Sequence, residues 1–110
     1  MEVTKSKIKE DSGELETAAL VFKALSDPAR LKILCFLANQ DDGKCCGTEE
    51  GICACDLEGV TALSQPTVSH HMKLLVSANL VLAEKRGKWM FYHIDAEGFT
   101  FVQSVLKQWQ

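Results

Sequence analysis

The chain has 110 residues, of which 46% are hydrophobic and 25% charged, a composition typical of one globular domain. Its net charge of −3 does not by itself suggest a nucleic-acid partner, and the absence of a long apolar run argues against a membrane span. No apolar signal segment opens the sequence, so we expect a cytoplasmic protein. In a reducing compartment, five cysteines indicate metal binding or redox chemistry before structural disulfides.

The charges are unevenly distributed along the chain. Acidic residues gather in the first 58 positions, whereas the stretch 73–88 carries four basic residues and one acid, Glu84. The basic residues are Lys73, Lys85, Arg86 and Lys88. A local basic patch of this kind can bind phosphates on a protein that is acidic overall.

Positions 1–13 are polar and lack apolar periodicity, which predicts a flexible N-terminal tail before a single domain at 14–110. A first helix is expected from Glu14 to Leu25, because apolar residues recur there at helical spacing. These residues are Leu15, Ala18, Ala19, Phe22 and Leu25.

Ser26-Asp27-Pro28 predicts the start of a second helix, since a polar cap followed by proline is a common helix start. The expected buried stripe of this helix excludes Arg30 and Lys32. Its members are Leu31, Leu34, Cys35 and Ala38. We therefore expect Cys35 to be a buried core residue.

A loop is expected at 39–51, because this stretch contains three glycines and no periodicity. The loop carries Cys45 and Cys46. A third helix is expected from near Cys53 to about Leu63. Its inward residues are Leu57, Val60 and Leu63.

Ser64-Gln65-Pro66 repeats the cap-and-proline signal and predicts a fourth helix that ends near Ala78. This helix has an apolar face of Val68, Met72 and Leu75, and an opposite polar face of Ser69, His70, Lys73 and Ser77. His71 lies off the polar face, so we expect it to be partly buried and to have no role in binding. Asn79 is expected to end the helix in a left-handed conformation.

Residues 81–94 predict a β-hairpin with a basic turn, in which Gly87 takes a positive φ. Asp95 is expected to cap a last helix. This order of elements predicts a mainly α fold with a β-hairpin wing, a winged helix-turn-helix. The first and last helices carry more apolar surface than one small core can use, so we expect them to pair with a second copy of the chain.

In a helix-turn-helix the second helix enters the major groove, and its early residues reach base edges. Taken singly, each polar residue of the fourth helix is better explained as ordinary surface. The polar face, the proline start and the basic hairpin together favour DNA binding. The expected DNA contacts are Gln65, Thr67, Ser69, His70, Lys73, Lys85, Arg86 and Lys88.

Cys53 and Cys55 stand two residues apart at the expected start of the third helix. In a regular helix they would project about 200° apart and could not bind one ion together. We therefore expect a regular helix start in the free protein and a distorted one after ligation, which would tilt the fourth helix. Amides at a helix N-terminus also favour the thiolate form that binds ions.

Thiolates select soft ions, and three sulfurs suit pyramidal trivalent arsenic or antimony. Cys45 or Cys46 would supply the third sulfur, whereas all four cysteines would form a tetrahedral site for zinc or cadmium. A permanent structural zinc site is one alternative, although Cys-Cys beside Cys-x-Cys fits its usual spacing poorly. Incidental thiols are another, which four cysteines within 11 residues disfavour.

Several segments resemble the ArsR/SmtB family of metal- and metalloid-responsive repressors, over about positions 15–94. They are 25–34 in the second helix, 53–57 in the family's arsenic box (Cys-x-Cys-Asp-Leu), 64–71 in its recognition helix, and Gly87-Lys88-Trp89 with Tyr92 in its wing. The resemblance implies a homodimer on a palindromic operator before a resistance operon, released when the ion binds. It implies neither a membrane nor an organic substrate.

The sequence departs from the family pattern at the ligands. One branch has a third cysteine three residues past the second, where this chain has Glu58, a poor arsenic ligand. The cadmium- and lead-sensing branch recruits upstream cysteines, and here Cys45 and Cys46 stand in the adjoining loop. The family's zinc site on the last helix is not expected, because no histidine or cysteine follows His93.

Three functions stay open at this point. The first is a repressor relieved by arsenite or antimonite through three thiolates, and the second is the same repressor sensing cadmium, lead or zinc through four. The third is a zinc-stabilised protein-interaction module, which metal removal would unfold and which would bind DNA negligibly. An enzyme is not expected, because the sequence shows no nucleophile–base pairing.

Overall fold

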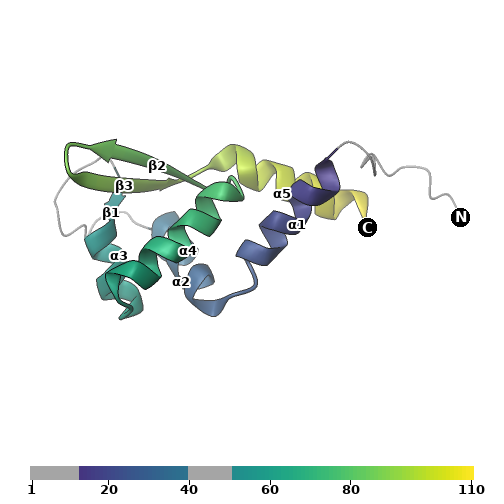
Figure 1. The fold of residues 1–110 in the computed structure, drawn as a ribbon. Helices are drawn as coiled ribbons and strands as arrows, with labels where there is room; N and C mark the ends of the chain where they lie inside the picture. The colour runs from purple at the N-terminus through teal and green to yellow at the C-terminus, as the bar shows by residue number, and fades with distance from the viewer. Residues whose placement is uncertain (1–12, 40–50) are drawn as a thin grey trace, which may run out of the picture.

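The computed structural model describes residues 13–39 and 51–110 and confirms the winged helix-turn-helix architecture (Figure 1). In chain order the elements are α1 (Glu14–Ala24), α2 (Pro28–Ala38), β1 (Ile52–Cys53), α3 (Ala54–Thr61), α4 (Gln65–Ser77), β2 (Val81–Arg86), β3 (Trp89–Ile94) and α5 (Ala96–Gln108). The predicted tail and the predicted loop fall largely outside the described residues, so the domain boundary at residue 13 stays a prediction. No helix within the described ranges has the length and apolarity that crossing a membrane demands.

Three helices begin directly after the polar residues that were predicted to cap them. Asp27 caps α2 by accepting a hydrogen bond from the Ala29 amide at 2.8 Å, and this bond lowers the pKa of Asp27. Asp95 caps α5 in the same way through the Glu97 amide. Ser64 is the N-cap of α4 as predicted, but its hydroxyl pairs with the Thr67 hydroxyl at 3.0 Å.

The sheet has three antiparallel strands in the order β1-β3-β2. The predicted hairpin is confirmed, with Gly87 at φ +62°, although Lys85 and Arg86 belong to β2 and not to the turn. Strand β1 was not predicted, because two residues are too few to show periodicity. It pairs Cys53 with Phe91 and shifts the start of the third helix to Ala54.

Helix α4 packs against α1, α2, α3 and β2, and it supplies several residues of the core. Its predicted apolar face is confirmed, since Val68, Met72 and Leu75 are all buried. Asn79 takes the predicted left-handed φ of +63° after this helix. Of the predicted inward face of α3, only Leu57 is fully buried, whereas Val60 and Leu63 are half-buried and Leu63 lies beyond the end of the helix at Thr61.

The predicted buried stripe of α2 is wrong for most of its members. Cys35 is exposed, and Leu31 is 45% exposed. The buried face instead comprises Arg30, Ile33, Leu34 and Leu37. The sequence of α2 is apolar nearly all round, so periodicity alone could not set its rotation.

Helices α1 and α5 lie side by side at the end of the molecule away from the hairpin (Figure 1). The buried face of α1 is Ala18, Val21 and Ala24, whereas the predicted Leu15 and Ala19 are exposed. Large apolar side chains remain exposed on both helices. They are Leu15, Leu20, Leu106 and Trp109. This surface is available to a partner.

The exposure of Cys35 leads to a stability prediction. Replacing it by serine should change the free energy of unfolding by less than about 0.5 kcal/mol, because the thiol fills no core space. Its buried neighbour is the matched control: Leu34→Ala should cost about 2–4 kcal/mol by leaving a cavity. Urea titrations of both variants measure these differences, and a cost for Cys35→Ser similar to that for Leu34→Ala would place the thiol in the core.

Candidate functional site

The predicted DNA contacts on α4 lie on its outer side. Gln65, Thr67, His70 and Lys73 are exposed, and Ser69 is half-buried. The opposite side is held in the core, so the polar face is presented on a fixed support. The structure therefore places these side chains on α4 outside the core, and the first of them lie at the helix N-terminus, where free amides favour phosphates.

A buried arginine holds α4 from beneath. The Arg30 guanidinium donates to Nδ1 of His71 at 2.8 Å, to the Ala24 carbonyl at 2.7 Å and to the Lys23 carbonyl at 3.3 Å. A guanidinium has no acceptor, so His71 accepts at Nδ1 and carries its proton at Nε2. This link ties the end of α1 and the start of α2 to the middle of α4.

The sequence does not predict the Arg30–His71 link: its periodicity puts Arg30 off the buried face and gives His71 no role. Two signals were available. Arg30 is a basic residue within an apolar helix, and His71 lies off the polar face of an amphipathic one. Neither signal indicates that the two residues contact one another, because 41 positions separate them in the sequence.

The hairpin divides its basic residues between two faces. Lys85 pairs across the strands with Met90, and both share a face with Tyr92 on the α4 side. Arg86 pairs with Trp89 and projects from the opposite face. Lys88 is exposed in the turn, with its ammonium 5.9 Å from the centre of the Trp89 ring.

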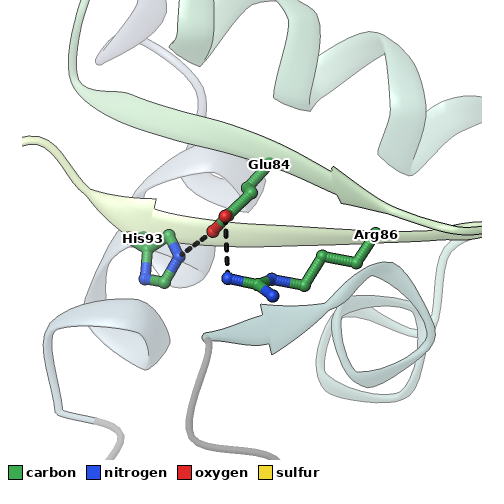
Figure 2. Close-up of polar contacts among 3 residues, drawn as sticks. All are labelled: Glu84, Arg86 and His93. Carbon is green, nitrogen blue, oxygen red and sulfur yellow. Dashed lines mark hydrogen bonds and ion pairs between the residues drawn. The ribbon is translucent and has the colours of Figure 1, made fainter.

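Arg86 already has an acidic partner on its face of the hairpin. Its Nη2 lies 2.8 Å from Oε2 of Glu84, whose other oxygen lies 3.5 Å from Nε2 of His93 (Figure 2). The side chains of Arg86 and Glu84 are nearly half exposed, so this pair contributes about 0–1 kcal/mol. Arg86 would have to exchange Glu84 for a phosphate in order to contact DNA.

The sulfurs of Cys53 and Cys55 are in contact, and the structure joins them as a disulfide. Cys53 is the N-cap of α3 and has an extended backbone, with φ −81° and ψ 161°. It therefore lies outside the helix, which removes the angular obstacle that a regular helix would present. The structure thus differs from the expectation that both cysteines lie in a regular helix, because pairing with β3 holds Cys53 extended and α3 begins at Ala54.

Asp56 joins the two cysteines in one cluster. One ligand atom from each of the three residues lies within 4.8 Å of the others, and Oδ2 of Asp56 accepts from the Cys53 amide at 3.2 Å. The two sulfurs, once reduced, fit a soft ion, whereas a carboxylate oxygen prefers harder ions. Asp56 was not predicted as a ligand. Cys45 and Cys46 lie outside the described residues.

Comparison with known proteins supports a single family. The model described as "Bacterial regulatory protein, arsR family" matches residues 27–82. An arsenical resistance operon repressor of Staphylococcus xylosus is 41% identical over 86 residues, which cover 78% of this chain and 73% of that protein. A cadmium resistance transcriptional regulatory protein CadC homolog of Staphylococcus aureus is 35% identical over 79 residues, 72% of this chain and 58% of that protein.

The fold is also similar to solved structures. The homodimeric winged helix-turn-helix DNA-binding domain of a possible ArsR-family regulator from Mycobacterium bovis matches with a TM-score of 0.64 and 26% identity. The match covers 93% of this chain and 89% of that one. The matched family segment, by contrast, leaves out α1 and α5, which lie on either side of it.

The Arg30–His71 link leads to a second stability prediction. Arg30→Ala should lower the free energy of unfolding by about 3 kcal/mol, because buried acceptors on His71, Ala24 and Lys23 lose their donor. Lys32→Ala, in the same helix but exposed, should cost less than about 0.5 kcal/mol. Chemical denaturation measures both values, and equal small effects would show that the link contributes little.

Proposed function

Because the chain belongs to the arsR family of bacterial regulatory proteins, we propose that it is a homodimeric repressor released from its operator by a thiophilic ion at Cys53 and Cys55. The family and the fold are those of DNA-binding transcription regulators and not of enzymes. The observation that carries the proposal is the contact between the two sulfurs at the joint of β1 and α3. We place this activity in the cytoplasm, where operator DNA and reduced thiols occur together.

The second copy docks on α1 and α5 in this proposal. These two helices lie at one end of the molecule (Figure 1), and their leucines, with Trp109 after α5, expose apolar surface. The M. bovis relative with this fold is described as homodimeric. A two-fold dimer presents two recognition helices, which suits a palindromic operator with half-sites one helical turn apart.

In the proposed complex, α4 enters the major groove and the hairpin contacts the adjoining minor groove. The first turn of α4 brings Gln65, Thr67 and Ser69 to base edges or phosphates. Phosphate contacts come from Lys73, Lys85 and Lys88. His70 and Arg86 add further phosphate contacts at the edge of this surface. Lys85 is better placed than Arg86, because Glu84 neutralises Arg86 on the other face of the hairpin.

Trivalent arsenic or antimony is the proposed inducer, held by Cys53, Cys55 and a third thiolate from Cys45 or Cys46. Three sulfurs match the pyramidal coordination of these ions, and the S. xylosus relative is an arsenical resistance repressor. Cadmium, with lead or zinc, is the second candidate and would use all four cysteines. The similarity to the CadC homolog of S. aureus favours keeping it.

Ion binding would reach the DNA-binding surface by two routes. Cys53 is in β1, which pairs with β3 of the hairpin, and Cys55 is in α3, which packs on α4. An ion that draws a third ligand toward these sulfurs would displace both elements together. Loss of the correct angle between α4 and the hairpin would then lower the affinity for the operator.

Cysteine variants test the sensor. Cys53→Ser and Cys55→Ser should each retain operator binding but lose release by arsenite, because each removes one sulfur ligand. Fluorescence anisotropy of the reduced, metal-free protein on its upstream DNA measures this, with arsenite and cadmium added in separate runs. Cys35→Ser, which leaves the cluster intact, is the matched control and should release like the wild type.

The outcomes of this titration separate the hypotheses. Preferential release by cadmium would favour the four-sulfur site, and release of either cluster variant at the wild-type ion concentration would exclude these cysteines as the sensor. Failure of the metal-free protein to bind DNA, together with unfolding on chelation, would favour a zinc-stabilised interaction module. Single Cys45→Ser and Cys46→Ser variants identify the third ligand.

The division of the hairpin leads to a salt-dependence prediction. Lys85→Ala should weaken binding to all sequences and reduce the slope of log K against log salt by about 1, as expected for one lost phosphate contact. Arg86→Ala should have a smaller effect, because Arg86 gives up Glu84 when it binds phosphate. Anisotropy titrations at several salt concentrations measure both slopes, and a larger loss for Arg86→Ala would contradict the assignment of the two faces.

A further inference from the structure

A groove runs between α4 and the hairpin, formed by two adjoining hollows. One has a volume of about 210 Å³ and extends to Ala54 and Gln65, and the other has a volume of about 360 Å³ and extends to Lys73 and Ser77. Both hollows are lined by Ser69, Met90 and Tyr92. The groove thus lies between the two elements that are proposed to contact DNA.

Tyr92 lines this groove, and packing in the core explains its ring but not its hydroxyl. It is only 9% exposed, and its ring belongs to the core. Its hydroxyl forms no hydrogen bond with any residue in 13–39 or 51–110. A buried tyrosine hydroxyl normally has a partner, so the groove is expected to receive one from outside the chain.

The course of the sugar–phosphate backbone in the proposed complex indicates the hydrogen-bond partner of the Tyr92 hydroxyl. A single sugar–phosphate backbone separates the major groove from the adjoining minor groove. A helix in the first and a hairpin in the second must therefore straddle one backbone, which passes over the space between α4 and the hairpin. A phosphate of that backbone is the chemical group brought closest to the groove.

The lining of the groove suits an anion. Its lining residues include Ser69, Ser77 and Tyr92, which carry hydroxyls, and Lys73, which carries an ammonium. Lys85 lies on the same face of the hairpin. None of the described residues that line either hollow is a carboxylate. Burial raises the pKa of Tyr92, so its hydroxyl keeps its proton and remains a donor near neutral pH.

We propose that this groove seats one backbone phosphate of each operator half-site, and that the Tyr92 hydroxyl donates a hydrogen bond to a non-bridging oxygen of that phosphate. The inference rests on the proposed function, because it requires α4 and the hairpin to bind duplex DNA. It adds a contact from a core residue to those expected from the exposed polar face. In this proposal the Tyr92 hydroxyl forms no hydrogen bond within the described residues of the free protein and gains one when the phosphate binds.

The test removes the hydroxyl and keeps the ring. Tyr92→Phe should weaken operator binding about tenfold, the loss expected for one hydrogen bond to a charged group. The salt slope should stay unchanged, since no charge is lost, and the melting temperature should stay equal or rise, because an unpaired buried polar group is removed. Thr100→Val, which removes an exposed hydroxyl on α5 that lines neither hollow, is the matched control and should bind like the wild type.

Neutral methylphosphonate substitution along the operator locates the phosphate. One position in each half-site should weaken the wild type yet add little to the loss in Tyr92→Phe, as expected for two groups that act on one another. Equal operator affinity of Tyr92→Phe and the wild type would overturn this proposal and leave the repressor intact, with water as the partner of the hydroxyl. A wild type that does not bind DNA would overturn the proposed function and this inference together.

Discussion

The pairing of the two-residue strand β1 with β3 is the constraint on which the arrangement of the site depends. It holds Cys53 extended opposite Phe91, and this places the first sulfur outside the helix and against the second. Gly51 permits the approach: at φ +123°, a Cβ there would lie 2.7 Å from the Tyr92 carbonyl oxygen. The cysteine pair is therefore part of the wing sheet as much as of the helix that follows it.

Helix α4 is held by two different kinds of contact. Its apolar side packs into the core through Val68, Met72 and Leu75, a hydrophobic contact that has no preferred direction. The Arg30–His71 hydrogen bond is directional and fixes the helix to the end of α1. Since α1 also carries the proposed dimer surface, this one guanidinium relates the position of the recognition helix to the position of the second subunit.

The sequence predicted those elements whose signals are local. Asp27, Ser64 and Asp95 start helices where expected, and Gly87 turns the hairpin. The sequence could not predict which face of α2 is buried, because apolar residues lie on nearly every side of this helix. The burial of Arg30 accompanies a hydrogen bond to His71, which is distant in the sequence. Strand β1 has no local signal, since its pairing depends on a strand about 40 positions later.

The cysteine cluster and the groove between α4 and the hairpin share one segment of backbone. Ala54, the residue between Cys53 and Cys55, lines the hollow that also contains Gln65 and Tyr92. Any ligand that changes the backbone at this segment also changes the wall of the proposed phosphate site. An ion at the sulfurs then need not move α4 as a whole, because narrowing or widening this groove would be enough to misplace the backbone of the operator.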